Sequence, residues 1–272
     1  MPMYERFAQI YDKFMQDIPY EKWLLRINEW IKAYGISKPL PLPRKDFSPG
    51  LSPAELCLSE KNLVLELGCG TGTMTEMLYR LGYDMIGIDS SSEMLNIAIS
   101  KKETSGSNIL YLCQKMQEME LYSTVGTIIL ICDSLNYLLT SADIEKTLRL
   151  VHNYLYPGGI FIFDFNTKYK YEQVIGDATI AESDEDCAFI WENYYHAAKC
   201  LNEYDLTFFI KEESGYFARY QETHYQKGYE LEQIKGFLNE AGLEFIKAID
   251  DETEACPNEK SERIFVIAQK IK

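Results

Sequence analysis

A short apolar segment that runs into three alternate glycines constrains the fold of this 272-residue chain more than any other feature. Leu63–Leu67 has the length and composition of a buried strand, and it is followed by Gly68-Cys69-Gly70-Thr71-Gly72. A second apolar segment, Met85–Ile88, ends at Asp89, seventeen residues after the last of these glycines. Glycines at a strand-to-helix turn let a ligand approach the backbone, because a Cβ there would collide with it. The pattern predicts a ligand site at the carboxyl edge of a parallel sheet.

The chain between residues 63 and 163 alternates between strand and helix patterns. Further strands are predicted at 109–113, 128–132 and 160–163, with helical patterns between them. Ser90 and Glu93 form a capping box that predicts the start of one of these helices. Strands that alternate with helices imply parallel pairing through right-handed crossovers.

The C-terminal part adds one more helix, which ends at Gly242, and two strands at 243–249 and 264–268. The connector between these two strands is too short for a crossover helix, so we expect them to pair antiparallel. The chain is therefore predicted to be an α/β protein with a doubly wound, mostly parallel, Rossmann-like sheet of seven strands.

Three regions are predicted along the chain. Residues 1–59 hold an N-terminal helical lid and a proline-rich connector, and residues 60–168 together with 230–272 form the core. Residues 169–229 break the alternation and contain 14 of the 36 aromatic residues. We interpret this region as an inserted antiparallel sheet that caps the substrate side of the core. Its β-type runs lie at 189–195, 204–210 and 217–225.

Composition excludes several classes of function. The formal net charge of −15 disfavours nucleic acid and anionic membranes as partners. Seven Cys without a CxxC pair, and no recognisable secretory leader, predict free thiols in a cytoplasmic protein. No apolar stretch approaches the roughly 18–20 residues that cross a bilayer. Three scattered His give no metal-ligand spacing, so no metal site is expected. The sequence does not fix the oligomeric state, and a homodimer is compatible with it.

The spacing of the glycines discriminates between cofactors. A dinucleotide fingerprint reads GxGxxG, whereas this chain has GxGxG, with Glu66 two residues before the first glycine. A carboxylate so close to the bend disfavours a phosphate and favours a cationic ligand. An acidic residue such as Asp89, at the tip of the next strand, can accept hydrogen bonds from the ribose hydroxyls.

These residues resemble the motifs of class I S-adenosylmethionine-dependent methyltransferases. Val64–Gly72 is similar to the first motif of that family, and the similarity continues through Gly87–Leu95 and Leu155–Gly159. The resemblance covers residues 63–168 and extends to the C-terminal crossover at 230–242. It implies S-adenosylmethionine as the cofactor and in-line transfer of its methyl group to nitrogen or oxygen of a small molecule.

The resemblance also implies roles for individual residues around the cofactor. The methionine portion would lie on Gly68 and Gly70, with Glu66 near its ammonium group and Cys69 adjoining the site. Asp89 would bind the ribose hydroxyls of the nucleoside portion. Ser90 and Met94 would border the adenosine, and Met116 would pack on its adenine.

Three further residues are implied at the reacting end of the cofactor. Cys132 and Asp133, at the end of a strand, would lie beside the methionine and the transferable methyl. The segment Tyr4…Phe7…Tyr11-Asp12 resembles the lid helix of small-molecule members, with Tyr11 reaching the methionine carboxylate.

The chain departs from the family pattern at two positions. Lys115 stands where the family usually has an acidic residue that accepts the adenine amino hydrogens, and an ammonium group accepts no hydrogen bond. Gly126 stands where a fourth-strand Asp is common, and we expect this change to affect only packing.

The candidates for catalysis are Asp133 and His224. Alternate residues place Tyr220, Glu222 and His224 on one face of a strand, where His224 would orient or deprotonate a substrate with the help of Glu222. The competing interpretation is that this face is solvated. The stretch Glu222–Tyr225 also weakly resembles methyltransferases with an inserted sheet, including glycine and aminosugar N-methyltransferases.

Two other functions remain open at this stage. A protein that binds S-adenosylmethionine as a sensor, without catalysis, is favoured only by Lys115. A nicotinamide-dependent oxidoreductase is disfavoured by the glycine spacing.

Overall fold

The computed structural model describes residues 8–40, 60–212 and 214–271. Tyr4, Phe7 and most of the predicted proline-rich connector, including Pro41 and Pro53, lie outside the described residues. Among the helices of the described residues, none is long and apolar enough to cross a membrane.

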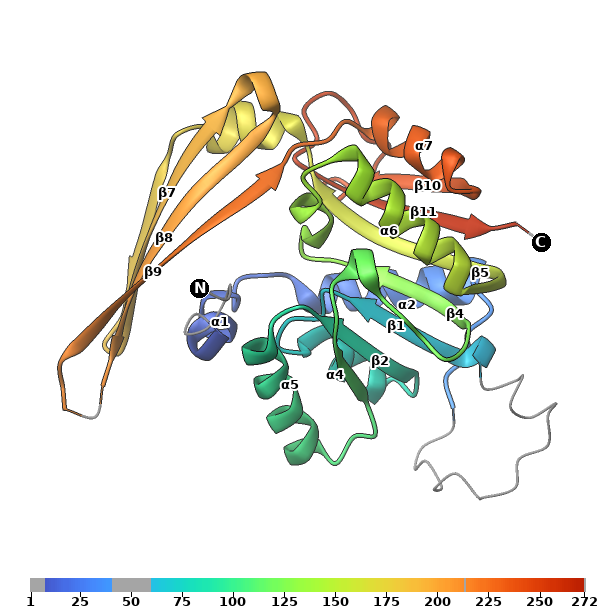
Figure 1. The fold of residues 1–272 in the computed structure, drawn as a ribbon, viewed down its shortest axis with the longest axis horizontal. Helices are drawn as coiled ribbons and strands as arrows, with labels where there is room; N and C mark the ends of the chain where they lie inside the picture. Colours follow the sequence, from blue (N-terminus) through green and yellow to red (C-terminus); the bar gives the residue numbers. More distant parts are fainter. Residues whose placement is uncertain (1–7, 41–59, 213, 272) are drawn as a thin grey trace.

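A seven-stranded sheet forms the centre of the molecule, in the strand order β10-β11-β5-β4-β1-β2-β3 (Figure 1). Strands β1 to β5 pair parallel, and β11 pairs antiparallel with both β5 and β10. The predicted fold class and the predicted antiparallel C-terminal pair are confirmed. The strands are β1 (Leu63–Leu67), β2 (Asp84–Asp89), β3 (Leu110–Cys113), β4 (Val125–Leu130), β5 (Leu155–Asn166), β10 (Leu243–Asp250) and β11 (Arg263–Lys270).

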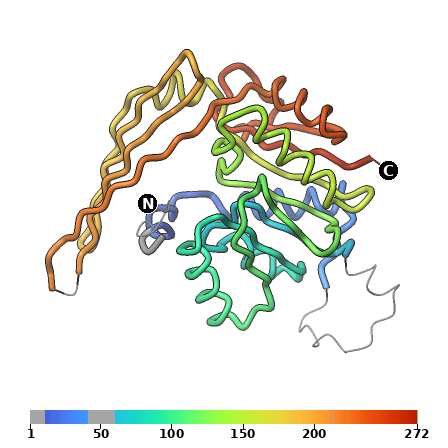
Figure 2. The backbone as a smooth tube through the Cα atoms, in the orientation of Figure 1, coloured from blue at the N-terminus to red at the C-terminus, as the bar shows by residue number. Residues whose placement is uncertain are grey.

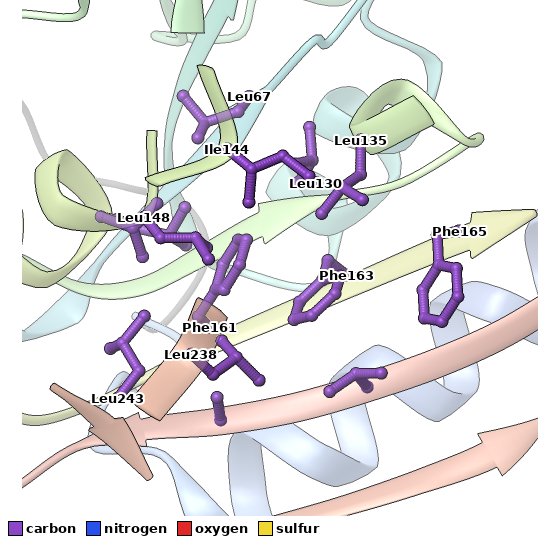
Figure 3. Close-up of a cluster of buried hydrophobic side chains, with 14 of the residues drawn as sticks. Leu67, Leu130, Leu135, Ile144, Leu148, Phe161, Phe163, Phe165, Leu238 and Leu243 are labelled. Carbon is purple, nitrogen blue, oxygen red and sulfur yellow. The ribbon is translucent and has the colours of Figure 1, made fainter. Parts of the chain in front are cut away.

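Helices cover both faces of this sheet. Neighbouring residues of each strand point to opposite faces, and both sets include apolar side chains that pack under helices. Val64 packs in one apolar cluster with residues of α2 and α4, and Leu65 and Leu67 pack in the other with residues of α6 and α7. Figure 3 shows the second cluster, in which Phe161 and Phe163 stack at 4.6 Å between ring centroids. The helices are α1 (Ala8–Phe14), α2 (Tyr20–Tyr34), α4 (Thr73–Arg80), α5 (Ser92–Ser105), α6 (Ser141–Tyr154) and α7 (Leu231–Glu240).

A second, four-stranded antiparallel sheet lies between β5 and α7 in the sequence and extends from the core as an arm (Figure 2). We call it the cap sheet. Its first strand was not predicted, because all five of its residues are exposed and carry no apolar alternation. Its strands are β6 (Thr179–Ser183), β7 (Cys187–His196), β8 (Leu201–Lys211) and β9 (Phe217–Lys227).

Short helices lie at the carboxyl ends of the core strands and at one turn of the cap sheet. They are η1 (Met116–Glu118), η2 (Ser134–Tyr137), the π-helix η3 (Lys170–Ile175) and η4 (Ala197–Lys199). The N-cap of α5 is Ser91, whose side chain accepts a hydrogen bond from the Met94 amide at 3.2 Å. The predicted capping box at Ser90 was therefore wrong by one residue.

Gly126 leaves room for the backbone of the segment before β1. A Cβ at this position would lie 1.9 Å from the carbonyl oxygen of Lys61 and 2.5 Å from Ser37 Oγ. The expectation that Gly126 is a packing residue is confirmed.

We predict that Gly126→Ala lowers the free energy of unfolding by about 2 kcal/mol or more, because the backbone of Lys61 has to move. The matched control is Gly236→Ala in α7, where a Cβ meets no atom within 4 Å and Ala favours the helix by up to about 1 kcal/mol. Urea unfolding of both variants tests this. Equal stability of the two variants would contradict it.

Candidate active site

One cavity of about 780 Å³ lies at the carboxyl ends of the core strands and continues under the cap sheet. This volume is in the upper part of the range for ligand sites. Most of the predicted site residues line it: Tyr11, Gly68, Gly70, Asp89, Ser90, Met94, Met116, Cys132, Asp133 and His224. We call the turn Gly68–Gly72 the glycine bend. Glu66 and Cys69 line a separate small cavity of about 40 Å³ behind this bend. Both cavities are bordered by Tyr11, Gly68, Gly70 and Cys132.

The glycine bend needs its glycines. Gly68, Gly70 and Gly72 have φ of +63°, +54° and +75°, which side chains other than glycine rarely adopt. A Cβ at Gly68 would lie 2.8 Å from Ser134 Oγ, whereas a Cβ at Gly70 would meet no atom within 4 Å. The space over Gly70 is therefore open to a ligand.

Asp89 fixes this bend from the tip of β2. Its Oδ2 accepts a hydrogen bond from the Gly70 amide at 2.8 Å, and its Oδ1 accepts one from the Ser91 amide at 2.8 Å. Burial raises the pKa of Asp89, and these backbone hydrogen bonds oppose that rise. Each carboxylate oxygen retains a second lone pair, so Asp89 can still accept hydrogen bonds from a ligand in the cavity.

Glu66 is a buried acid behind the bend. Its side chain is 2% exposed and accepts a hydrogen bond from the Thr75 hydroxyl. Burial raises the pKa of Glu66 to about 8, although the hydrogen bond from Thr75 opposes the rise. A cation placed beside Glu66 would restore its ionised form.

Helix α1 lies across the bend and contacts the cap sheet. Asp12 accepts a hydrogen bond from Thr71 Oγ1 at 2.5 Å and pairs with Lys101 at 2.6 Å. Phe14 packs edge-on against Phe189 of β7, with ring centroids 4.6 Å apart. The position of Tyr11, one residue before Asp12, is thereby fixed at the cavity wall.

A buried cluster of charges forms the floor of the cavity. Arg263 Nη2 contacts Asp133 Oδ1 at 2.7 Å, and Arg263 Nη1 forms an ion pair with Asp164. Burial raises the pKa of Asp164 to about 6, in spite of its pairing with Arg263. Asp133 also accepts a hydrogen bond from Gln226 Nε2 at 2.6 Å, and it has a φ of +50°. Asp133 is therefore held in one orientation by side chains of β9 and β11.

Asparagine and tyrosine side chains connect this floor to the cap sheet. Asn136 Nδ2 donates to the carbonyl oxygens of Asn166 at 2.8 Å and Lys227 at 2.7 Å. The Tyr171 hydroxyl donates to Gln226 Oε1 at 2.9 Å and accepts from Asn166 Nδ2 at 3.2 Å. The ends of β5 and β9 are joined by this network.

The inward face of the cap sheet is aromatic. His224 is 1% exposed, stacks on Tyr204 at 4.9 Å between centroids, and has its Nε2 at 3.3 Å from Glu222 Oε2. The hydroxyls of Tyr137 and Tyr204 meet at 2.7 Å. The predicted common face of Glu222 and His224 is confirmed, and the interpretation of that face as solvated was wrong.

The other two His lie elsewhere. His152 is on α6 against Gly242, and His196 contacts Glu203 on the surface at 2.8 Å. Lys115 is exposed at the rim of the cavity. Within the described ranges, no group of three or more His, Cys, Asp or Glu is arranged to hold a metal ion.

Sequence reasoning missed the residues that hold Asp133. Arg263 lies 130 residues and Gln226 lies 93 residues from it along the chain. One available signal was a charged residue, Arg263, directly before the apolar run of the last strand. Another was the alternation of Tyr204, Leu206 and Phe208 in β8, which indicates an inward apolar face.

We predict that Glu66→Gln removes a pH dependence of stability. The pKa of Glu66 rises from 4.5 to about 8 on folding, so between these values the folded state holds a proton that the unfolded state has lost. The stability that Glu66 provides is complete below pH 4.5 and is lost as the pH rises towards 8. From pH 5 to 7.5 the wild-type protein should lose up to about 3 kcal/mol relative to the variant in urea unfolding. Parallel pH curves would contradict this.

Comparison with known proteins places the chain in a family. Residues 64–159 match the family model of a methyltransferase domain. A candidate methyltransferase from Geobacillus sp. (strain WCH70) is 33% identical over 98% of this chain and 99% of its own length. A solved S-adenosylmethionine-dependent methyltransferase from Clostridium acetobutylicum superposes with a TM-score of 0.80, at 28% identity and with 99% of each chain covered.

A second solved structure shares the fold alone. CalS10, an amino pentose methyltransferase from Micromonospora echinaspora, superposes with a TM-score of 0.67 at 14% identity over 99% of both chains. The Geobacillus and Clostridium relatives that match over the full chain are both described as methyltransferases, and neither is described as a nicotinamide-dependent oxidoreductase or a cofactor sensor. The chain belongs to the class I S-adenosylmethionine-dependent methyltransferases and uses S-adenosylmethionine as its cofactor.

Proposed function

We propose that this enzyme transfers the methyl group of S-adenosylmethionine to a nitrogen or oxygen atom of a small molecule bound under the cap sheet. The observation that carries the proposal is the single cavity that runs from Gly70 and Asp89 to the aromatic face around Tyr204. CalS10, which shares this fold, acts on an amino pentose, in keeping with an acceptor of that size. The net charge of −15 likewise supports a small molecule over a nucleic acid.

The residues of the bend fit the cofactor. The open space over Gly70 accommodates a ligand close to the backbone, and Asp89 offers its remaining lone pairs to the ribose hydroxyls. We assign the methionine end to Gly68, Tyr11 and Cys132, with Glu66 and Cys69 behind the bend. Glu66 supplies the negative charge that an ammonium group requires. The nucleoside end is assigned to Ser90, Met94 and Met116.

The bound cofactor supplies an electrophilic methyl group on a positively charged sulfur. Asp133, which lines the cavity, accepts a hydrogen bond from the N–H or O–H of the acceptor and so aligns its lone pair with the methyl. Arg263 and Gln226 keep the Asp133 carboxylate in place while it does so. Helix α1 and the cap sheet exclude water from the reaction.

We assign His224 a positioning role in the same pocket. Its ring stacks on Tyr204, and its Nε2 lies beside Glu222 rather than beside Asp133. His224 therefore holds the aromatic wall against which the acceptor packs, and Asp133 is the residue that touches the reacting group.

We predict that Asp89→Ala weakens the binding of S-adenosylhomocysteine at least tenfold, because both the ribose contact and the hydrogen bond to Gly70 are lost. Calorimetric titration measures this. The control is Asp205→Ala on the outer face of the cap sheet, where Asp205 accepts a hydrogen bond only from Thr223 among the described residues. Unchanged affinity in Asp89→Ala would remove the ribose assignment.

We predict methyl transfer from labelled S-adenosylmethionine to at least one member of a panel of small amines, phenols and alcohols. With that acceptor, Asp133→Asn should lower kcat at least tenfold while the affinity for S-adenosylhomocysteine changes less than threefold. Wild-type activity in the variant would contradict the role of Asp133. Tight cofactor binding without turnover of any acceptor would contradict the proposed acceptor class.

A further inference from the structure

Lys170 stands apart among the basic side chains that line the cavity. Within the described part of the chain the one polar contact of its side chain is a hydrogen bond donated by Nζ to Asn166 Oδ1 at 3.1 Å, and it has no ion pair. Arg263, on the same cavity, forms ion pairs with both Asp133 and Asp164. Lys115 is exposed to solvent at the rim.

The Lys170 side chain is half-buried and has no carboxylate partner among the described residues, which is unfavourable for its positive charge. Burial lowers the pKa of Lys170, and the positive charge of Arg263 lowers it further. Asp133, Glu262 and Asp164 attract the ammonium but do not overcome these two effects on its pKa. The carboxylates of Asp133 and Asp164 already pair with Arg263.

The position of Lys170 relates it to the reacting group. It is the first residue of η3, the yellow helix between β5 and the cap sheet in Figure 1. Such π-helical turns are rare and occur frequently at functional sites. A chain of hydrogen bonds leads from Lys170 to Asn166 and onward through Tyr171 and Gln226 to Asp133. Lys170 and Asp133 are therefore two ends of one hydrogen-bonded wall of the acceptor pocket.

We propose that Lys170 is the anion-binding residue of the acceptor pocket, and that the methyl acceptor carries a carboxylate or a phosphate in addition to its nucleophilic nitrogen or oxygen. The inference rests on the proposed function and narrows its substrate class. The anion supplies the counter-charge that Lys170 lacks. The body of the acceptor packs against the side chains of Trp191, Tyr204 and His224, and its nucleophile meets Asp133.

The test uses small aromatic probes and the full-length protein saturated with S-adenosylhomocysteine. Dissociation constants are measured by calorimetry for benzoate, phenyl phosphate and benzyl alcohol, which share a ring that suits the aromatic wall. We expect at least one of the two anions to bind tenfold or more tightly than benzyl alcohol. The tighter of the two anions identifies the group as carboxylate or phosphate.

Variants at Lys170 assign this preference to one side chain. Lys170→Met should reduce the preference for the anion to less than twofold, and Lys170→Arg should retain it. The control is Lys168→Met, which removes a lysine that pairs with Glu172 at 4.0 Å and does not line the cavity. Unchanged affinity for S-adenosylhomocysteine shows that each variant is folded.

Two outcomes would overturn the proposal: no preference for either anion in the wild-type protein, or a preference that persists in Lys170→Met. Failure of the wild-type protein to bind S-adenosylhomocysteine is a separate result and would contradict the placement of the cofactor. Cofactor binding without anion preference would leave that placement intact and remove only the role of Lys170.

Discussion

The carboxylate of Asp89 holds the glycine bend in the shape on which the whole site depends. It accepts the backbone N–H of Gly70 on one side and that of Ser91, the N-cap of α5, on the other. A bend of glycines with positive φ is entropically costly, and a half-buried carboxylate that accepts hydrogen bonds from two backbone amides restricts it to one form. The space over Gly70 is open only because this bend carries no side chain.

A second set of buried polar groups joins the cap-sheet side of the cavity to the core. Arg263 forms ion pairs with Asp133 and Asp164. Removing either carboxylate would leave the charge of Arg263 partly unpaired, which is unfavourable in a low-dielectric interior. Asn136 adds three hydrogen bonds across two separate segments. The cap sheet extends far from the core, yet its base at Gln226 is attached directly to Asp133. The floor of the cavity and the base of the cap sheet are therefore joined by one hydrogen-bonded network.

Local patterns in the sequence were sufficient for most of the core. The alternation of strands and helices is a property of short segments, and the observed sheet confirms the fold that it predicted. The glycine spacing and the position of Asp89 are also local features, and the structure brings both to the cavity at the carboxyl ends of the strands. Strand β6 was missed because a fully exposed edge strand has no apolar period. The helix cap fell on Ser91 rather than Ser90, since two adjacent serines give the same local signal.

The partners of Asp133 were beyond such reasoning, because Arg263 and Gln226 reach it only through tertiary structure. Lys170 carried no signal at all as one lysine between two tyrosines. We propose that one cavity holds the cofactor on the glycine bend with its sulfur directed at Asp133. A crystal structure of the protein with S-adenosylhomocysteine is the decisive test of this placement. We expect the ligand along Gly68 and Gly70, with its ribose on Asp89. A ligand bound elsewhere, with the bend empty, would contradict it.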